Sequence, residues 1–494
     1  MRSSPKEDPE APNAFPIYKQ EDAPIFDDDI EIKCPSHTTE AKLMAKVDMR
    51  VIPCLCILYL LAFLDRVNIS NAAVFGLPQD IHLTGTEYNT ALTIFFVPYV
   101  VAEIPSNILM KKLQPHVWLS ACMFFFGIAA LCQGFAHNYG GLLAARFFLG
   151  LFECGMFPGC FYLIGMWYKR SEAQRRYSFF FSSTTLAGAF AGLLASAIGK
   201  MDGVRGLQGW RWVFILEGLF TCVVAIIFFF LLPDFPETAR WLKEDERVYV
   251  KARLQVDQGR SAADKPITLK DVVNVFKDYK VFLGALMYFG LIVPGYGYAY
   301  FAPGIIKSYG YSPISTQLHS VPPWAAAFGF AMLIAFLSDK FKHRFIFALI
   351  PLAVCIAGFG ILIKVHDNTR LQYGALFLVA MGAYSAMPVI VCWFNMNLGG
   401  HHRRSVGSAF QVGFGNIGGI IATYSFLAKD KPKYIPGYSI CISFVCLSVV
   451  SCIAYFLATW SQNRARDRTP QDLSLTEYEK TEMGDLSPDY RYLL

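Results

Sequence analysis

Long apolar segments recur along this chain and constrain its fold more than any other feature. Each is about twenty residues long with few charges, which is enough for a helix to cross the roughly 30 Å hydrocarbon layer of a bilayer. Hydrophobic residues make up 54% of the 494 residues and charged residues only 17%, whereas an average soluble chain is about one quarter charged. This composition excludes an ordinary soluble enzyme and predicts a polytopic membrane protein.

Twelve candidate spans fall into two groups of six. They begin near residues 51, 88, 117, 141, 177 and 211, and near 281, 320, 345, 371, 404 and 437. We therefore predict an all-α membrane protein with two six-helix bundles, at 47–232 and 281–461, joined by a polar cytosolic linker at 233–280. The remaining segments are a disordered acidic tail at 1–46, which has no signal peptide, and a polar tail at 462–494.

Loop charges predict that both tails are cytosolic, because Lys and Arg favour the cytosolic side of a membrane. The predicted inner loops of the first half carry Lys111, Lys112, Lys169, Arg170, Arg175 and Arg176, against Lys200 and Arg205 outside. Topology thus explains much of the +6 net charge, and we expect no nucleic-acid partner. Most of the 13 Cys lie in apolar runs, where Cys acts as a small hydrophobe, so we expect neither a metal site nor a cofactor.

Six ionisable residues stand well inside the predicted spans, and all belong to the first half: Asp65, Arg66, Glu103, Arg146, Glu153 and Glu217. Charge inside a bilayer is costly, so each is a candidate functional residue, although pairing that only holds the bundle together is an alternative for any one of them. Two cations cannot neutralise four carboxylates. At least one carboxylate should therefore hold a proton, or gain one during transport.

Arg66 and Arg146 should lie at nearly the same depth, which predicts a binding site for an anion. A rise of about 1.5 Å per residue puts Arg66 roughly 24 Å above the inner face and Arg146 roughly 8 Å below the outer end of its span. Two guanidinium groups at one level offer donors matched to a carboxylate. Glu153 lies two turns after Arg146 on the same helix face, and we expect it to carry the coupled proton.

The other carboxylates have nearer candidate partners. Asp65 adjoins Arg66 and could neutralise it, and Glu217 lies near the outer face, close to Arg211. Helix-end contacts could satisfy Glu103 near the inner end of its span. Asp65 and Glu217 nevertheless remain candidates for proton coupling.

The second half supplies neutral candidates for substrate binding. Tyr296 and Tyr300 are four residues apart and share a helix face, so they could pack on an aromatic or heterocyclic substrate. An aromatic belt near the outer surface is the alternative. Asn395 and Asn416 could donate hydrogen bonds to a substrate.

Equivalent short basic loops follow spans two and eight, at 108–116 and 336–344, and suggest a duplication. In the second loop we expect Asp339, Lys340 and Arg344 to form a cytosolic gate that holds the loop against a neighbouring helix when the protein faces outward. Two parallel six-helix repeats around a midplane site are the architecture of major facilitator transporters, and the chain resembles that superfamily.

Specific strings narrow this resemblance to the fungal allantoate permease family, a branch of the anion:cation symporters. They are LDRVNISNA at 64–72, EIPSN at 103–107, the run at 146–158, WYKR at 167–170, GWRW at 209–212 with EG at 217–218, PETARWL at 236–242, RSVGSA at 404–409 and YIPGY at 434–438. The resemblance covers nearly the whole chain between the tails.

The resemblance implies uptake of small organic anions such as nicotinate, pantothenate or allantoate, usually with protons. It places Arg66, Arg146 and Glu153 at the positions that serve the substrate and the coupling ion in the wider group. The cation that related glutamate carriers place on helix seven is missing here, which favours a monoanion. Asp339 and Lys340 match the superfamily's inner-loop motif, whereas Lys111 and Lys112 depart from it.

We therefore expect a monomeric, proton-coupled importer of a small organic monoanion in the plasma membrane, and not an enzyme. An exporter of an anionic secondary metabolite is the alternative, although the Gly-Pro motif common on helix five of drug exporters is absent at 188–192. A nutrient sensor without transport is a second alternative. It would normally carry a longer signalling tail.

Overall fold

The structure, a computed structural model, describes residues 34–258, 269–399, 401–468, 485, 487, 488 and 490–494. Every regular element in these ranges is a helix. The predicted all-α membrane fold is confirmed.

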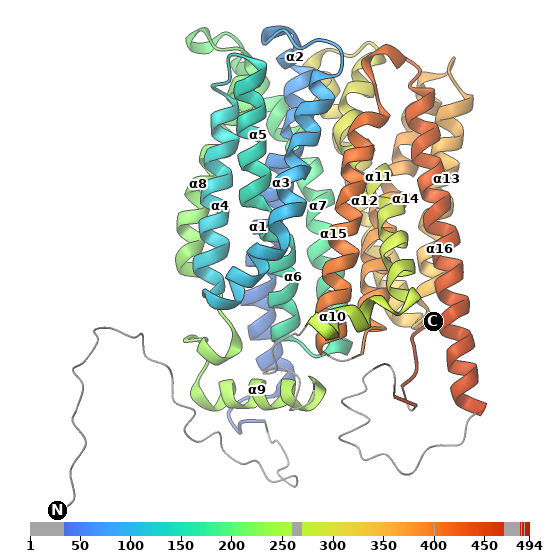
Figure 1. Ribbon diagram of the computed structural model, residues 1–494. Helices are drawn as coiled ribbons and strands as arrows, with labels where there is room; N and C mark the ends of the chain where they lie inside the picture. Colours follow the sequence, from blue (N-terminus) through green and yellow to red (C-terminus); the bar gives the residue numbers. More distant parts are fainter. Residues whose placement is uncertain (1–33, 259–268, 400, 469–484, 486, 489) are drawn as a thin grey trace, which may run out of the picture.

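Long helices stand side by side in two groups (Figure 1). The first, which we call the N half, contains α1 (Glu40–Val74), α3 (Glu87–Lys112), α4 (Pro115–Gln133), α5 (Tyr139–Glu153), α6 (Met156–Trp167), α7 (Arg170–Ile198) and α8 (Gly209–Leu231). The second, the C half, contains α11 (Tyr279–Ser308), α12 (Pro313–Phe341), α13 (Arg344–Lys364), α14 (Thr369–Met396), α15 (His401–Ser425) and α16 (Ile435–Arg468).

Ten segments of the described chain are long and apolar enough to cross a membrane, with α5 and α6 counted as one. Helices α3 and α15 are not among the ten, but they run beside the others for the height of the bundle (Figure 1). Each predicted span coincides with one long helix or with the α5 and α6 pair. The count of twelve spans, the domain boundaries and the cytosolic location of the termini stay predictions.

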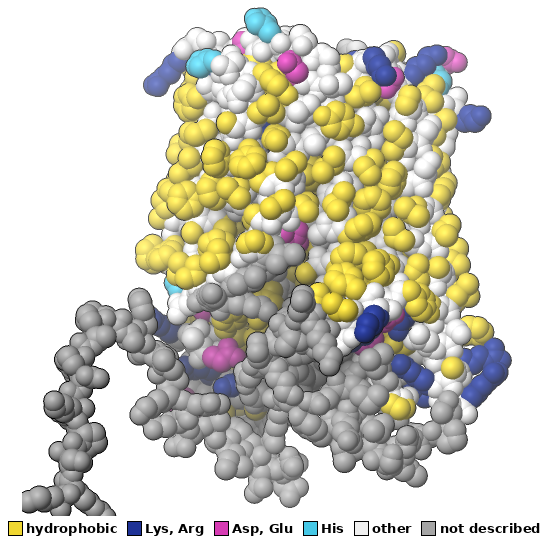
Figure 2. Space-filling model, in the orientation of Figure 1, with side chains coloured by type: hydrophobic (Ala, Val, Ile, Leu, Met, Phe, Trp, Pro, Cys, Tyr) yellow, Lys and Arg dark blue, Asp and Glu magenta, His cyan; other side chains and the backbone are white. Residues whose placement is uncertain are grey.

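The face of the bundle seen in Figure 2 carries a broad apolar belt, with most of the visible charged side chains at its two ends. On α8 the side chains of Leu219, Phe220, Val223, Ile227 and Phe230 are exposed. A soluble protein would bury such a surface, whereas lipid tails match it. The belt therefore marks the depth of the hydrocarbon layer.

Short helices lie at one end of the bundle, beside the start of α1 and the last described residues, and we call this the inner end (Figure 1). They are α9 (Glu244–Gln258) and α10 (Leu269–Phe276). Glu246 of α9 accepts hydrogen bonds from Lys46 Nζ of α1 at 2.6 Å and from the Lys243 amide at 3.0 Å. Burial alone would raise the pKa of Glu246, but these donors outweigh it and hold the pKa below its usual value.

A row of hydrogen bonds joins the two halves at the opposite, outer end. Asn89 of α3 donates to the carbonyl oxygens of Thr423 and Phe426, at 2.6 and 3.1 Å. Lys307 of α11 donates to the carbonyl oxygen of Val74 at 2.7 Å. We call this row the outer seam. It closes the outer end of the space between the halves.

Candidate functional site

Close packing brings α1, α3 and α5 together around the predicted charged residues. A Cβ atom at Gly150 of α5 would clash with the carbonyl oxygen of Phe95 on α3, so only glycine permits this approach. All six intramembrane ionisable residues are buried, each with 4% or less of its surface exposed. The expectation that these charges lie inside the bundle is confirmed.

Arg66 and Glu153 form a buried ion pair. Arg66 Nε donates to Glu153 Oε1 at 2.9 Å, and a second guanidinium nitrogen donates to the same oxygen. The third nitrogen of the fork donates to the hydroxyl of Tyr296 on α11, across the boundary between the halves. The interpretation that Asp65 neutralises Arg66 is therefore wrong: Asp65 adjoins it in sequence, but consecutive helical side chains point to different sides.

Arg146 is fully buried and has no ion-pair partner among the described residues. Its Nε donates to the carbonyl oxygen of Ala91 at 3.3 Å, and its NH1 to that of Arg66 at 3.2 Å. No hydrogen bond satisfies NH2. Tyr300 of α11 lies beside it. Arg146 thus combines a buried positive charge with a free donor.

Aromatic rings enclose both guanidinium groups. The Arg66 group lies 5.0 Å from the ring centroids of Phe95 and of Tyr99, and the Arg146 group lies 5.4 Å from that of Phe95. Ring faces attract cations and exclude water, which strengthens the interaction of a guanidinium with an anion.

Tyr296 and Tyr300 form the wall of this site on the C half. Their rings stack with centroids 5.6 Å apart and planes inclined by 15°, and the edge of Phe96 packs on Tyr296. Both tyrosines are buried among these helices, which excludes the aromatic belt as their location. Whether a substrate packs on them stays a prediction.

Asp65 of α1 faces α8. One carboxyl oxygen accepts from the hydroxyl of Thr221 at 2.8 Å, and the other has no hydrogen-bond partner. Without a cation beside it, this group is best accommodated as a neutral acid.

Glu217 of α8 faces α1, where it accepts a hydrogen bond from the amide of Asn68. Its expected neighbour Arg211 instead pairs with Asp80 at 2.9 Å and donates to two backbone carbonyls at the outer end of α4. Six residues along a helix rotate a side chain to another face, so closeness in sequence again misleads. Glu217 is a second carboxyl group without a cation.

Glu103 lies where α3 meets α15, and no helix-end contact satisfies it. Neither carboxyl oxygen has a hydrogen bond of good geometry among the described residues. Asn416 of α15 faces the carboxyl group, and Gly413 of the same helix lies beside it. The expectation of helix-end partners is wrong, and Asn416 contacts a carboxyl group at the boundary between the halves.

Asn395 is occupied within the C half. Its amide nitrogen donates to the carbonyl oxygen of Val391 at 2.8 Å, and its oxygen accepts from the hydroxyl of Ser408. The structure does not bring it to the arginine site.

The expected gate residues lie together, but their ion pair stays within one loop. Asp339, near the end of α12, pairs with Arg344, the first residue of α13, at 2.9 Å. Lys340 is exposed. The pair therefore fixes the turn between α12 and α13. Whether the loop is held against a neighbouring helix when the protein faces outward stays a prediction.

Sequence reasoning missed the residues that complete the site: Asn68, Phe95, Tyr99 and Thr221. Nothing in the sequence distinguishes Phe95 and Tyr99 among the 43 Phe and 25 Tyr of the chain. Asn68 and Thr221 could have been found from the sequence. Asn68 lies three residues after Asp65 and Thr221 four residues after Glu217, so each shares a helix face with a buried carboxyl group.

Comparison with known families decides the class of protein. The sequence profile of the Major Facilitator Superfamily matches residues 55–423. The chain belongs to the major facilitator superfamily. Its membership accounts for the two helical halves and for the location of the charged site between them.

Fungal major facilitator proteins align with nearly the whole chain. An uncharacterized transporter of Schizosaccharomyces pombe is 33% identical over 93% of this chain and 92% of its own length. The major facilitator-type transporter hxnP of Emericella nidulans is 33% identical over 92% and 93%. The MFS transporter prlL of a fungal species is 34% identical over 85% and 87%.

A solved major facilitator structure supports the fold. A bacterial homologue of the human lysosomal transporter Spinster, inward-facing and unoccupied, superposes with a TM-score of 0.62 at 17% identity. The match covers 85% of this chain and 98% of that one.

Proposed function

We propose that this major facilitator protein is a proton-coupled importer of a small organic monoanion, such as a carboxylate, in the plasma membrane. The observation that carries the proposal is Arg146, a fully buried guanidinium with no carboxylate partner among the described residues and one unsatisfied nitrogen. A buried unpaired cation is costly, so an anion that arrives there is strongly favoured. One free cation fits one negative charge.

The ion pair of Arg66 and Glu153 supports proton coupling. Protonation of Glu153 would remove its charge and release Arg66, which could then join Arg146 in holding the anion. Deprotonation would restore the pair and expel the anion. A proton and an anion would therefore enter and leave together, which is the requirement for symport.

The proposed exchange of charges involves Arg66, Arg146, Glu153 and the substrate. It is unaffected by the other three carboxyl groups, those of Asp65, Glu103 and Glu217, if they are neutral acids. Their lack of cationic partners supports that state. The likeness of the sequence strings to the fungal allantoate permeases supports the substrate class and the direction of transport.

Uptake of a labelled panel tests this proposal. Cells that express the chain would receive nicotinate, pantothenate, allantoate and biotin, with and without a protonophore, and Arg146→Gln serves as the matched inactive variant. We expect uptake of at least one acid that the protonophore and the substitution both abolish. Reduced accumulation relative to empty cells would instead indicate export, and unchanged accumulation of every acid would refute anion transport.

A further inference from the structure

The last residues of the described chain are docked across the inner end of the C half. Tyr492 exchanges two hydrogen bonds with Asn463 of α16, both 2.9 Å long. Leu493 exchanges two with Asn397 after α14, at 2.7 and 3.0 Å. The carbonyl oxygen of Leu494 accepts from the Arg344 amide at 2.8 Å. We call the docked residues 485, 487 and 490–494 the strap.

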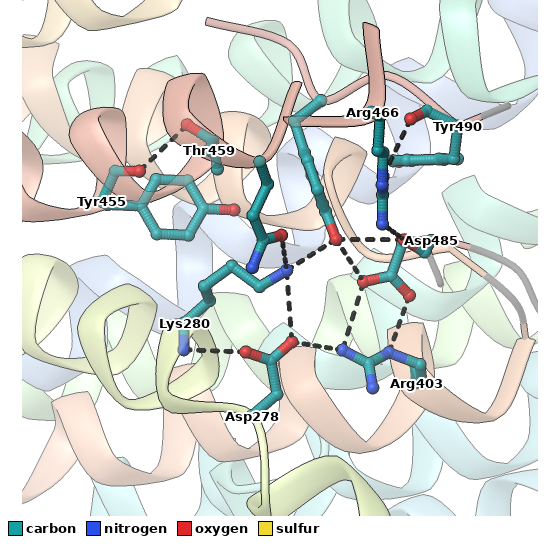
Figure 3. Close-up of polar contacts among 10 residues, drawn as sticks. Asp278, Lys280, Arg403, Tyr455, Thr459, Arg466, Asp485 and Tyr490 are labelled. Atoms are coloured by element: carbon teal, nitrogen blue, oxygen red, sulfur yellow. Dashed lines mark hydrogen bonds and ion pairs between the residues drawn. The ribbon is translucent and has the colours of Figure 1, made fainter. Parts of the chain in front are cut away.

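A cluster of charges anchors the other end of the strap (Figure 3). Arg403 of α15 lies between two carboxylates, 2.5 Å from Asp278 and 2.7 Å from Asp485. Lys280 of α11 lies 3.4 Å from Asp278 and donates to the Tyr492 hydroxyl at 2.5 Å. Two cations thus face two carboxylates, and among these four described charges Asp485 belongs to the strap.

The charge balance of the cluster depends on the strap. Lys280 and Asp485 have 5% and 1% of their surface exposed. If the strap left, Lys280 and Arg403 would share Asp278 and lose the carboxylate and the hydroxyl that the strap supplies, so that water would have to compensate the excess positive charge. The C half therefore contains a built docking site for its own terminal segment.

The corner between α14 and α15 receives most of the remaining contacts. Trp393 Nε1 donates to the Leu493 carbonyl oxygen at 2.8 Å, and the Tyr490 hydroxyl donates to the Met396 carbonyl oxygen at 3.0 Å. Arg466 of α16 donates to the carbonyl oxygens of Tyr490 and Asp485. The strap thereby links this corner to α11, α13 and α16.

We propose that the strap is an intramolecular clamp that makes the inner ends of α11, α13, α14, α15 and α16 move as one body, with Asp485 as its charged anchor. Release of the strap loosens the corner at 393–403 and slows the conformational step of transport without changing the binding site. This role does not depend on the identity of the substrate.

Hydrogen exchange of the full chain in detergent, followed by mass spectrometry of the 393–403 peptide, tests the clamp. A variant that ends at Gly484 lacks the strap, and Asp485→Asn and Asn397→Ala weaken its two ends. We expect exchange of the peptide to accelerate about tenfold or more in the shortened chain, as the loss of several hydrogen bonds implies. Arg491→Ala is the matched control, because its ion pair with Asp467 is exposed.

Rescue separates a specific clamp from general instability. A synthetic peptide of residues 485–494, added to the shortened chain, should restore slow exchange, and the same peptide with Asp485→Asn should do so less well. In vesicles, the shortened chain should keep its KM for the transported substrate and lose turnover several-fold. Unchanged exchange in the shortened chain, or failure of the peptide to restore it in folded protein, would overturn the proposal.

Discussion

The two buried arginines differ in what surrounds them, and this difference predicts different roles for them. Arg66 is held by Glu153 and Tyr296, whereas Arg146 keeps a free donor. Arg146→Lys retains the charge but loses the planar fork, so we expect KM for the substrate to rise about tenfold or more. Arg211→Lys, a guanidinium outside the site, should leave KM within about twofold. Wild-type KM in Arg146→Lys would remove it from the binding site.

Glu153→Gln imitates the protonated carboxyl group and cannot pair ionically with Arg66. We expect this variant to exchange labelled for unlabelled substrate across a membrane while it loses accumulation driven by a proton gradient. Both rates would be measured in the same vesicles. Normal accumulation would mean that the proton binds elsewhere, and Asp65→Asn would be the next variant to measure.

Glu103→Gln tests whether the unpaired carboxyl groups are neutral. Because an amide has nearly the shape of a protonated carboxyl group, we expect the thermal unfolding midpoint to stay close to that of the wild type. Glu153→Gln should lower the midpoint clearly, since it leaves Arg66 as a second unpaired cation. If both substitutions lowered the unfolding midpoint equally, Glu103 would not be a neutral acid.

At the scale of helices, the sequence predicts the spans well and their side-chain partners poorly. Apolar length locates each long helix because lipid contact depends on composition alone. Which side chains contact a buried carboxyl group depends on which helices pack side by side. The spacing of residues along one helix carries no information about this packing, so the partners of the four carboxyl groups could not be predicted. The pairs inferred from adjacency in sequence, Asp65 with Arg66 and Arg211 with Glu217, are therefore wrong, and the functional roles of the site residues stay predictions.

Docking of α9 on α1 should depend on pH through Glu246. The pKa of this carboxyl group is lowered in the folded protein, so its contribution is present above the pKa of the unfolded chain and is lost as pH falls through the lower folded value. Ordinary Glu titrates near about 4.3. Hydrogen exchange of 244–254, corrected for its intrinsic rate, should therefore accelerate below about pH 4. Glu246→Gln should exchange fast at pH 7 as well, and slow exchange there would contradict this role.

At the scale of the whole molecule, the outer seam sets the balance between conformations. Asn89→Ala leaves the carbonyl oxygens of Thr423 and Phe426 without this donor, and each lost buried hydrogen bond costs about 1–3 kcal/mol. We expect the outer end to open more often. A cysteine placed at the buried position Thr423 should then react faster with an impermeant maleimide, once the exposed Cys132 and Cys446 are replaced by serine.

Thr90→Ala is the matched control for the seam. Thr90 follows Asn89 in the sequence, and its hydroxyl contacts the Tyr424 hydroxyl at 2.9 Å. This contact is exposed. The control should leave the labelling rate unchanged. Equal rates in Asn89→Ala and the control would show that the seam does not hold the outer end closed.

The outer seam also determines how the two halves can diverge in evolution. Asn89, Lys307, Ser70 and Gln317 all donate to backbone carbonyl oxygens of the opposite half. A carbonyl oxygen is present whatever side chain its residue carries, so mutation at the acceptor positions leaves these bonds available. Selection should therefore constrain these donors more than their acceptors, and covariation across these bonds should be weak. Thr423 is an exception, because its hydroxyl also contacts the Thr93 hydroxyl of the opposite half at 2.6 Å.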